Sequence, residues 1–565
     1  MKNERKFTTE VALYGLIFLA ALVLRLIQLG QPPLLDSEAR LAFQAWQLAQ
    51  GETIPVASQV AYLSVTEGLF SLFEASNFLA RFWPAFAGSL LIWLPFFLRG
   101  ELKRIPALVL AVGLALDPAL IPVSRLSGSP MPALAFLALA AGAFHRRNIP
   151  WAVFFMGLGL FSGPGFWLGF LFLAIAVLVS KMLGLFSPGE YFKSRMDYFQ
   201  GKPEVWLVGI TPALLTLFMM GSFILSNFQG ISAWAGALPE FLLKWGGPAG
   251  LGIGQFLTYL LLNNPLALVF GILGYVSAWR SRDRLGQVLS VLFMVSLLGM
   301  LVYPQRQAVD LIWPVIPLWI SAAAELVRIS RLARSTWVTQ VLGGLVVVLA
   351  SLNWLTFTGM IFQAARENAL LLEFGLMAAS LALLILSAAV VSSEWGWNTA
   401  WKGLSGGFAN ALLLGLVASL TLDTYILDKD PRSIFSGGSG SGQVELLVDS
   451  IADASITATG RPDSIQGAVI NDSDALRWAL REYEGFDYLV SLPSEMDYPL
   501  LITSVEGDFQ ALQENYRGQD FVLSSHPGWG RVLPDDWISW IAFRKGPVVR
   551  EYLILWVRND IYSGY

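Results

Sequence analysis

The sequence predicts a polytopic α-helical membrane protein with a small α/β domain at its C-terminal end. Apolar residues make up 55% of the 565 residues and charged residues only 14%, whereas a soluble globular chain has roughly 25% charged residues. Apolar runs that approach the length of a membrane span, about 20 residues, recur about 13 times before residue 427. Beyond that point the chain becomes polar and acidic. We therefore exclude a soluble enzyme, a nucleic-acid-binding protein and a disulfide-stabilised secreted domain.

The predicted spans are thirteen apolar segments. They cover residues 11–29, 78–98, 105–123, 131–144, 150–162, 165–182, 204–226, 255–279, 286–302, 309–328, 337–360, 369–391 and 406–427. Segment 59–73 is also apolar, but it is short, contains Glu67, and as a span would invert every later loop. We predict that it forms a helix at the membrane surface.

Basic residues indicate the orientation. Lys and Arg gather in the N-terminal tail and in alternate loops, at 99–104, 146–147, 181–202, 280–284, 328–334 and 402. Because positively charged loops stay on the cytoplasmic side, the N-terminus is predicted to be cytoplasmic. The predicted protein is a multi-pass protein of the plasma membrane, and its C-terminal domain is extracytoplasmic.

The C-terminal region has its own composition. A Gly/Ser linker, residues 428–442, separates the transmembrane module 1–427 from a domain at 443–565, and from residue 428 on there are 21 Asp and Glu against 11 Lys and Arg. Strand-like apolar runs occur at 444–448, 486–492, 520–524 and 537–543, and a helical stretch at 472–485. We expect an acidic α/β domain.

The residue inventory excludes several kinds of chemistry. The chain has no cysteine and two histidines, His145 in a basic loop and His526 in the tail. Thiol catalysis and zinc sites that need cysteine are therefore excluded, while carboxylates binding Mg²⁺ or Mn²⁺ stay compatible with the sequence.

The first outer loop, residues 30–77, is the most informative segment. After Pro32-Pro33, either Asp36 or Ser37 is expected to cap a helix that runs to Gln50. Asp36 and Glu38 stand at its start. A two-residue step turns a helix by about 200°, so the two side chains are expected to point to nearly opposite sides. Taken alone, this position suits helix capping and a favourable dipole interaction.

A family resemblance adds a catalytic interpretation. The segments LGQPPLLDSEARLAFQAW (29–46) and 61–99 resemble the protein O-mannosyltransferase and aminoarabinose-transferase branch of the GT-C glycosyltransferases, family 39, in a bacterial subgroup with a C-terminal exterior domain. Ala80-Arg81, Pro84 and Gly88 fit the family's next span, and the likeness covers residues 10–180. An ungapped match places Glu38 on the family's Glu and Ser37 on its Asp, with Asp36 one position early. The acidic residue that follows Ser-Arg in the family is absent after Arg125.

The resemblance implies inverting transfer from a polyprenyl-phosphate sugar to an acceptor hydroxyl at the outer face. Asp36 or Glu38 would take the acceptor proton, and Arg side chains would hold the lipid phosphate. The candidates are outer cations that the charge rule does not explain: Arg125 and Arg306 first, then Arg40 and Lys244. For each of them, contact with lipid headgroups is the alternative. Lys244 lies in an outer loop, 230–250, which suits either an ordinary aromatic belt at the membrane interface or a flexible flap over a lipid tail.

Two other functions fit the sequence. The altered Asp-Ser-Glu motif suits a non-catalytic membrane protein that binds lipid-linked glycan or assists a flippase. A transporter is a further alternative, although no inverted repeat is visible. The implied partners are the bilayer, a polyprenyl-phosphate sugar and an acceptor that is a protein, lipid or glycan, with no role for nucleic acid.

Overall fold

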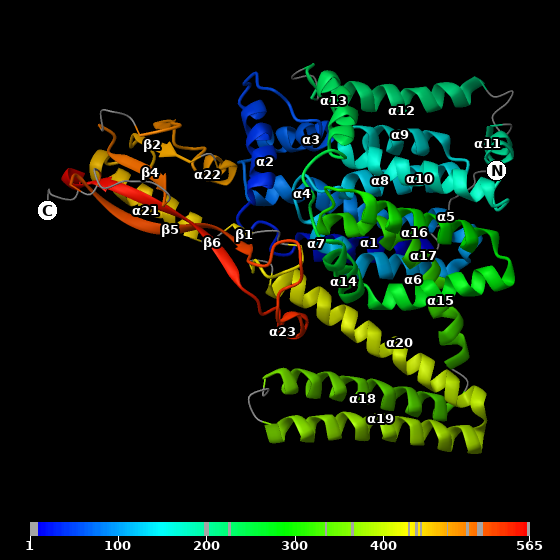
Figure 1. Ribbon diagram of the computed structural model, residues 1–565. Coiled ribbons are helices and arrows are strands. Elements are labelled where there is room, and N and C mark those ends of the chain that lie inside the picture. Colours follow the sequence, from blue (N-terminus) through cyan, green and yellow to red (C-terminus); the bar gives the residue numbers. More distant parts are fainter. Residues whose placement is uncertain are drawn as a thin grey trace.

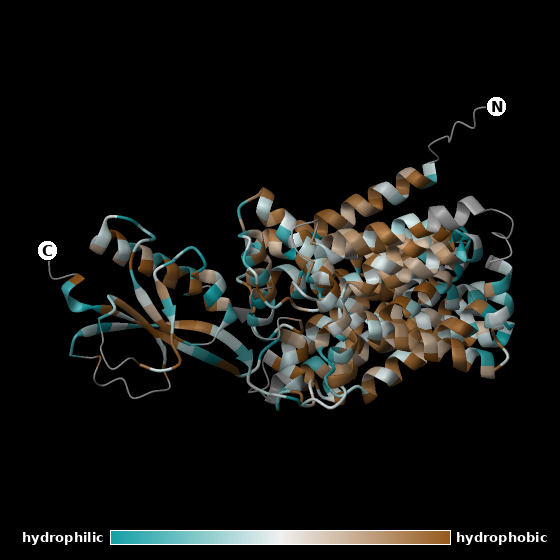
Figure 2. Ribbon diagram, turned by 90° about the horizontal axis from the view of Figure 1, so that it is seen from above, coloured by the Kyte–Doolittle hydropathy of each residue, from teal (hydrophilic) through white to brown (hydrophobic). Residues whose placement is uncertain are grey.

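The protein is a bundle of helices with a β-sheet domain at one end, as Figure 1 shows. The computed structural model describes residues 9–196, 203–223, 228–333, 336–362, 367–427, 430–435, 439–440, 443–471, 473–492, 497–505, 512 and 514–561. Figure 2 shows apolar residues throughout the helical bundle and a more polar sheet domain. The chain is therefore a multi-pass membrane protein with an appended polar domain.

The bundle contains helices up to residue 426. They are α1 (Thr9–Leu26), α2 (Asp36–Ala49), α3 (Val60–Leu72), α4 (Asn77–Leu90), η1 (Leu91–Trp93), α5 (Leu94–Leu102), α6 (Arg104–Leu116), α7 (Leu120–Ser124), α8 (Met131–His145), α9 (Ile149–Leu160), α10 (Pro164–Met182), α11 (Pro188–Met196), α12 (Pro203–Gly221), α13 (Gly230–Leu243), α14 (Ile253–Asn263), α15 (Pro265–Ser281), α16 (Arg284–Val302), η3 (Ala308–Leu311), α17 (Ile312–Ala333), α18 (Trp337–Phe362), α19 (Glu367–Trp395), α20 (Trp397–Thr421) and the π-helical turn η4 (Leu422–Ile426).

The described part of the chain has eight helices that are long and apolar enough to cross a membrane. Four further predicted spans correspond to the shorter apolar helices Arg104–Leu116, Met131–His145, Ile149–Leu160 and Ile210–Gly221. The prediction of one continuous span over 255–279 is wrong, because α14 and α15 meet there at 92°. Pro265 begins α15 and lacks an N–H group, and it disfavours helical geometry at Asn264, so the chain bends between the two helices.

Three of the loops that were predicted to be cytoplasmic lie near one another where they are described. Arg99 Nη1 lies 3.5 Å from Glu10 Oε1, which joins α5 to α1. His145 Nδ1 lies 3.1 Å from the Tyr191 hydroxyl, which joins α8 to α11. In Figure 1, α11 and the sheet domain lie at opposite ends of the bundle. The described part of the loop at 181–202 therefore lies away from the sheet domain.

The helices α18 and α19 form a hairpin beside α20 rather than in the bundle core (Figure 1). Glycines allow the close approach of α18 to α20: a Cβ on Gly407 would lie 2.5 Å from the Gly343 carbonyl oxygen. Small residues at such contacts are typical of helix packing in membranes, where close backbone approach provides the stabilisation.

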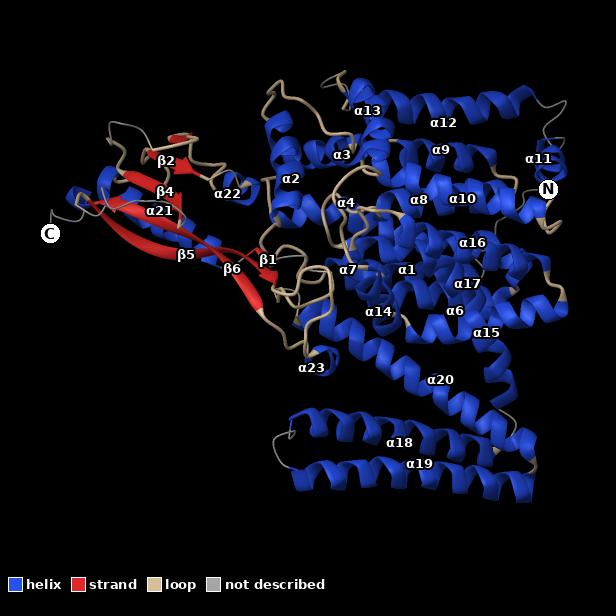
Figure 3. Ribbon diagram, viewed as in Figure 1, coloured by secondary structure: helices blue, strands red, loops and turns tan. Residues whose placement is uncertain are grey.

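The C-terminal domain is a six-stranded sheet in the order β1-β5-β6-β4-β2-β3, drawn in red in Figure 3. Its elements are β1 (Ser439–Gly440), α21 (Gln443–Thr459), β2 (Gly467–Ile470), α22 (Asp474–Ala479), β3 (Phe486–Tyr488), β4 (Leu500–Ser504), β5 (Tyr516–Pro527), α23 (Trp537–Phe543), β6 (Val548–Arg558) and the turn η6 (Asn559–Ile561). The strands β4, β2 and β3 are parallel, and the other neighbours are antiparallel. An apolar core lies between α21 and the sheet and includes Leu447, Ile451 and Leu555.

Two of the four predicted strands are helices instead. Residues 444–448 belong to α21, which buries Val444, Leu447 and Ile451 at helical spacing. Residues 537–543 form α23, which is capped by Asp536. A run of five to seven apolar residues fits both the two-residue repeat of a strand and the 3.6-residue repeat of a helix. Such a short run therefore could not distinguish a strand from a helix. The described part of the predicted linker includes β1, which pairs with β5.

Candidate functional site

Helix α2 begins one residue earlier than predicted, so neither Asp36 nor Ser37 is its N-cap. The N-cap residue is Leu35, and Asp36 is the first helical residue. Glu38 instead accepts a hydrogen bond from the Leu35 amide at 3.1 Å. The cap prediction is therefore wrong, although the two acidic side chains do point to different neighbours, as the helical step requires.

Glu38 forms a buried, bidentate ion pair with Arg81 of α4. Arg81 Nη2 lies 2.6 Å from Oε2 and Nε lies 2.9 Å from Oε1, and the two side chains are only 4% and 1% exposed. The Ser127 amide donates to Oε1 at 2.8 Å. Both oxygens of Glu38 are thus engaged, each with two donors, and neither is open to solvent.

The same guanidinium group fixes the chain that leads into α2. Arg81 Nη1 donates to the carbonyls of Leu29 at 3.2 Å and Pro32 at 2.7 Å, and Nη2 donates to Pro33 at 3.0 Å. Arg81 therefore holds the Pro-Pro turn and Glu38 together. Arg81 therefore fixes the direction in which α2 starts, and its role is to position the helix.

Asp36 is exposed and contacts the C-terminal domain. Its Oδ1 accepts hydrogen bonds from the Ser473 hydroxyl at 2.6 Å and from the Ala475 amide at 2.8 Å. Among the described residues its Oδ2 has no hydrogen-bond partner. Ser473 also caps α22 by accepting from the Leu476 amide. Asp36 thus stands at the N-terminus of α22, 437 residues away in the sequence.

Arg125 binds the end of α1. Its Nη1 donates to the Ile27 carbonyl at 2.6 Å and to the Arg25 carbonyl at 3.4 Å, and its guanidinium carbon lies 5.5 Å from the centre of the Tyr425 ring. A cation there complements the carbonyl groups at a helix C-terminus. Arg125 is 4% exposed, so it shapes the outer end of α1.

Arg306 and Lys244 lie in a second group, in and near the loop after α13. The Gly250 amide donates to the Pro304 carbonyl at 2.9 Å, so the end of the predicted flap 230–250 is tied down, and residues 230–243 of that loop form the helix α13. Arg306 Nη1 donates to the carbonyls of Tyr303 at 2.8 Å and Leu301 at 3.0 Å. Its Nε is buried without a hydrogen-bond partner in the described chain. This donor is available to an acceptor from outside the chain.

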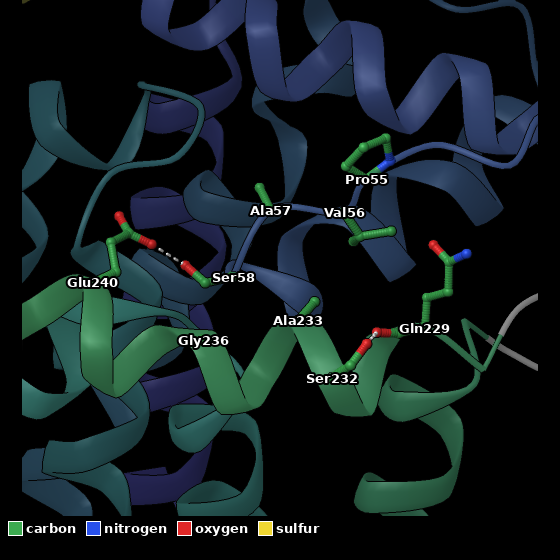
Figure 4. Close-up of a pocket in the computed structure, with 9 residues that line it drawn as sticks. All are labelled: Pro55, Val56, Ala57, Ser58, Gln229, Ser232, Ala233, Gly236 and Glu240. Atoms are coloured by element: carbon green, nitrogen blue, oxygen red, sulfur yellow. Dashed lines mark hydrogen bonds between the residues drawn. The ribbon is translucent and has the colours of Figure 1, made fainter.

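A cavity of about 500 Å³ opens between residues 55–58 and α13. Figure 4 shows Ser58 and Glu240 hydrogen-bonded to one another in the wall of this cavity. The Ser58 hydroxyl donates to Glu240 Oε2 at 2.5 Å, and Lys244 Nζ lies 3.0 Å from Glu240 Oε1. Burial and the charges of Asp310 and Glu240 raise the pKa of Tyr303 above its usual range. The cavity therefore offers a hydroxyl, a carboxylate and a nearby ammonium group.

The structure groups the predicted residues in two places. Neither Asp36 nor Glu38 makes a hydrogen bond or ion pair with Lys244 or Arg306, as far as the chain is described. Helix α2 connects the two places, because Gln44 accepts from the Ala57 amide beside the cavity at 3.3 Å. Gln44 is eight residues beyond Asp36, or about 12 Å along a helix. Arg40 is exposed on α2 between them.

Sequence reasoning missed Ser58, Glu240 and Ser473. Glu240 stands four residues before Lys244 in a predicted outer loop, and that spacing was a usable sign of an ion pair. Nothing local to Ser473 indicated its contact with Asp36. The described residues contain no group of three or more His, Cys, Asp or Glu side chains that would hold a metal ion. His526 lies beside Ser524 and Glu551 on the sheet.

No protein-family model and no curated protein matches the sequence. The structure is similar to the crystal structure of ArnT from Cupriavidus metallidurans bound to undecaprenyl phosphate, with a TM-score of 0.55 and 16% identity over 96% of this chain and 97% of that one. It is also similar to ArnT from the same organism in the apo state, with a TM-score of 0.52 and 15% identity over 97% of this chain and 98% of that one. The chain therefore has the fold of the GT-C membrane glycosyltransferases.

Proposed function

We propose that the protein is an inverting glycosyltransferase that moves a sugar from a polyprenyl-phosphate donor to an acceptor hydroxyl. The observation that carries this proposal is a shared fold, over almost the whole of both chains, with an ArnT structure that holds undecaprenyl phosphate. The acceptor is a hydroxyl group on a protein, lipid or glycan. The reaction takes place at the outer face of the plasma membrane, on the side of the sheet domain.

Asp36 is the proposed base. It is the exposed acid of the Asp-Ser-Glu motif, and its Oδ1 already accepts a hydrogen bond from the Ser473 hydroxyl at 2.6 Å. A general base must lie within hydrogen-bond reach of the hydroxyl that it activates. As the acceptor oxygen attacks the anomeric carbon, the bond from that carbon to the phosphate oxygen breaks. The phosphate leaves with both electrons, so no general acid is required.

Glu38 is assigned a positioning role in this proposal. Its two oxygens have four donors between them, two from Arg81 and one each from Leu35 and Ser127. Removing a proton from an acceptor would require that network to open. The pair with Arg81 instead keeps the start of α2, and with it Asp36, in one orientation.

The lipid phosphate is proposed to bind near Arg306. Its buried Nε is a donor without an acceptor in the described chain, and a phosphate oxygen would satisfy it. Lys244 and Arg40 add positive charge, Lys244 at the cavity rim and Arg40 on α2. Arg125 donates to carbonyls at the end of α1, so it is not assigned to the phosphate in this proposal.

A second candidate function is binding of a lipid-linked glycan without catalysis. It is favoured by one observation, the contact of α22 with Asp36, which occupies Oδ1. In that case the sheet domain permanently covers the acid, and the protein assists a partner such as a flippase.

The two functions are separated by one assay. Purified protein in vesicles receives labelled polyprenyl-phosphate sugars and hydroxyl acceptors, with Mg²⁺, with Mn²⁺ or with EDTA. Wild type is compared with Asp36→Asn, Glu38→Gln and Glu240→Gln. Loss of transfer in Asp36→Asn but not in Glu240→Gln, with stability and donor binding intact, supports the proposal; Glu38→Gln is expected to lose transfer together with stability. If the wild type binds the donor saturably but transfers no sugar, the protein is a binding protein. If transfer is lost only in Glu240→Gln, Glu240 in the cavity is the base.

A further inference from the structure

A short segment around the start of α14, residues 250–255, contacts the loop that carries Arg306. We call it the junction segment. The Gly250 amide donates to the Pro304 carbonyl at 2.9 Å, and the Leu251 amide donates to the Arg306 carbonyl at 2.8 Å. These two hydrogen bonds hold the backbone from which the Arg306 guanidinium group extends. The position of that guanidinium group therefore depends on the junction segment.

The junction segment is also bound by the sheet domain. The Gln255 side chain is buried, and its Nε2 donates to the carbonyls of Gly530 at 3.0 Å and Val532 at 2.5 Å. Both carbonyls belong to the loop between β5 and α23. The Gln255 Oε1 accepts from the Gly252 amide at 3.1 Å, at the N-terminus of α14. One buried amide thus joins the sheet domain to the start of α14.

Two glycines allow the junction segment to approach both neighbours closely. A Cβ on Gly252 would collide with the Arg531 carbonyl oxygen of the sheet domain, and a Cβ on Gly250 would collide with the Arg306 carbonyl oxygen. The φ of Gly252 is −66°, a value open to any residue. The close contact, and not the backbone conformation, therefore requires glycine there. Because close-packed interiors transmit displacements, a shift of the sheet-domain loop reaches the Arg306 backbone.

The sheet-domain side of this contact is firmly held against the bundle. The rings of Trp529 and Trp540 lie 6.1 Å apart, and the Tyr259 ring of α14 lies 5.5 Å from Trp540. Arg544 Nη2 lies 3.2 Å from the buried Asp423 carboxylate. Opening such a buried ion pair is costly. The loop between β5 and α23 is therefore a fixed support for the junction segment.

We infer that the sheet domain is part of the donor-phosphate site. Through Gln255 and the glycines at 250 and 252 it holds the Arg306 backbone, and with it the buried Nε that the proposed function assigns to the lipid phosphate. These three are positioning residues, because they act through Arg306. The inference rests on the proposed function, since it concerns the same phosphate. In that proposal the acceptor hydroxyl binds at Asp36, so loosening the junction segment raises the KM for the donor and leaves the KM for the acceptor unchanged.

Matched alanine variants of two neighbouring glycines test this coupling. Gly252→Ala pushes against the Arg531 carbonyl, whereas Gly254→Ala makes the same change two residues later, where a Cβ would have nothing within 4 Å. Gln255→Leu removes the hydrogen bonds to the sheet domain. Each change is made in the full chain in vesicles, once with Arg306 and once with Arg306→Gln. Equilibrium binding of undecaprenyl phosphate and amide hydrogen exchange are measured for every protein.

We expect Gly252→Ala and Gln255→Leu each to weaken binding of undecaprenyl phosphate by about two- to tenfold, the effect of roughly one hydrogen bond. Exchange of the two amides that pair with the Arg306 loop rises in both variants, because their hydrogen bonds open more often. Gly254→Ala behaves as wild type in both measurements. With Arg306→Gln, neither change weakens binding further, since residues that act through one group are not additive with its loss.

Equal losses of binding with Arg306 and with Arg306→Gln would mean general destabilisation and would overturn the inference. Unchanged amide exchange in both variants would overturn it as well, because the sheet domain would then not hold the loop. If Arg306→Gln alone left binding unchanged, the phosphate site of the proposed function would be wrong, and the inference would fail with it. Absence of transfer in wild type removes the enzymatic proposal only, because binding and exchange still decide the coupling.

Discussion

Glu38 Oε2 and Arg81 Nη2 lie 2.6 Å apart in a buried ion pair that joins the start of α2 to α4. The pair explains why one acid of the Asp-Ser-Glu motif is a structural element and the other is available for chemistry. Its Coulomb attraction operates away from water, where an unpaired charge is strongly unfavourable.

We predict that Glu38→Gln and Arg81→Met each destabilise the protein. Removing either partner leaves an uncompensated buried charge or donor, which costs about 3–5 kcal/mol. The change is measured as the free energy of unfolding in detergent. Arg40→Met, on the exposed face of α2, is the control and should have almost no effect. If Glu38→Gln were fully stable but inactive, Glu38 would take part in the chemistry.

Asp36→Asn should separate catalysis from folding. The amide oxygen can still accept from Ser473 and Ala475, so thermal stability should stay within experimental error of wild type. Loss of a general base lowers the rate by about 100- to 10,000-fold. The measurement is kcat at saturating donor, and full activity in this variant would exclude Asp36 as the base.

Arg306→Gln should weaken binding of polyprenyl phosphate by about 10- to 100-fold, the effect of a hydrogen bond to a charged group. Lys244→Gln should weaken it less, because Lys244 is partly exposed and already pairs with Glu240. Equilibrium binding to vesicles checks both. Arg280→Gln, in a predicted cytoplasmic loop, serves as the comparison, and an equal loss there would indicate general membrane electrostatics.

Acid should loosen α23. Hydrogen bonds from Ser539 lower the pKa of Asp536, the cap of that helix. A carboxylate whose pKa is lower in the folded state stabilises it above the unfolded value of about 3.9. That stabilisation is lost as the pH falls through the folded pKa. Amide hydrogen exchange over 537–543, corrected for intrinsic rates, should rise below about pH 4, and Asp536→Asn should lack this step.

Local sequence patterns predicted the structure correctly where hydropathy and charge along a single segment decide it. The apolar runs and the alternation of basic loops predicted the membrane fold, because each run must avoid water by itself. They were insufficient for short apolar segments. The patterns of residues 444–448 and 537–543 fit a strand as well as a helix. In the folded protein both are helical: α21 packs on the sheet, and α23 packs on Tyr259.

By itself the sequence determined that this chain is a multi-pass helical protein with a polar C-terminal domain and an acidic motif in its first long loop. Those properties depend on hydropathy, charge and order along the chain. Only the tertiary structure decided that Glu38 is paired with Arg81, that Asp36 faces α22, and that Glu240 accepts a hydrogen bond from Ser58 in the wall of a cavity. A carboxylate's role depends on which donors surround it, and here those donors come from residues 43, 437 and 182 positions away.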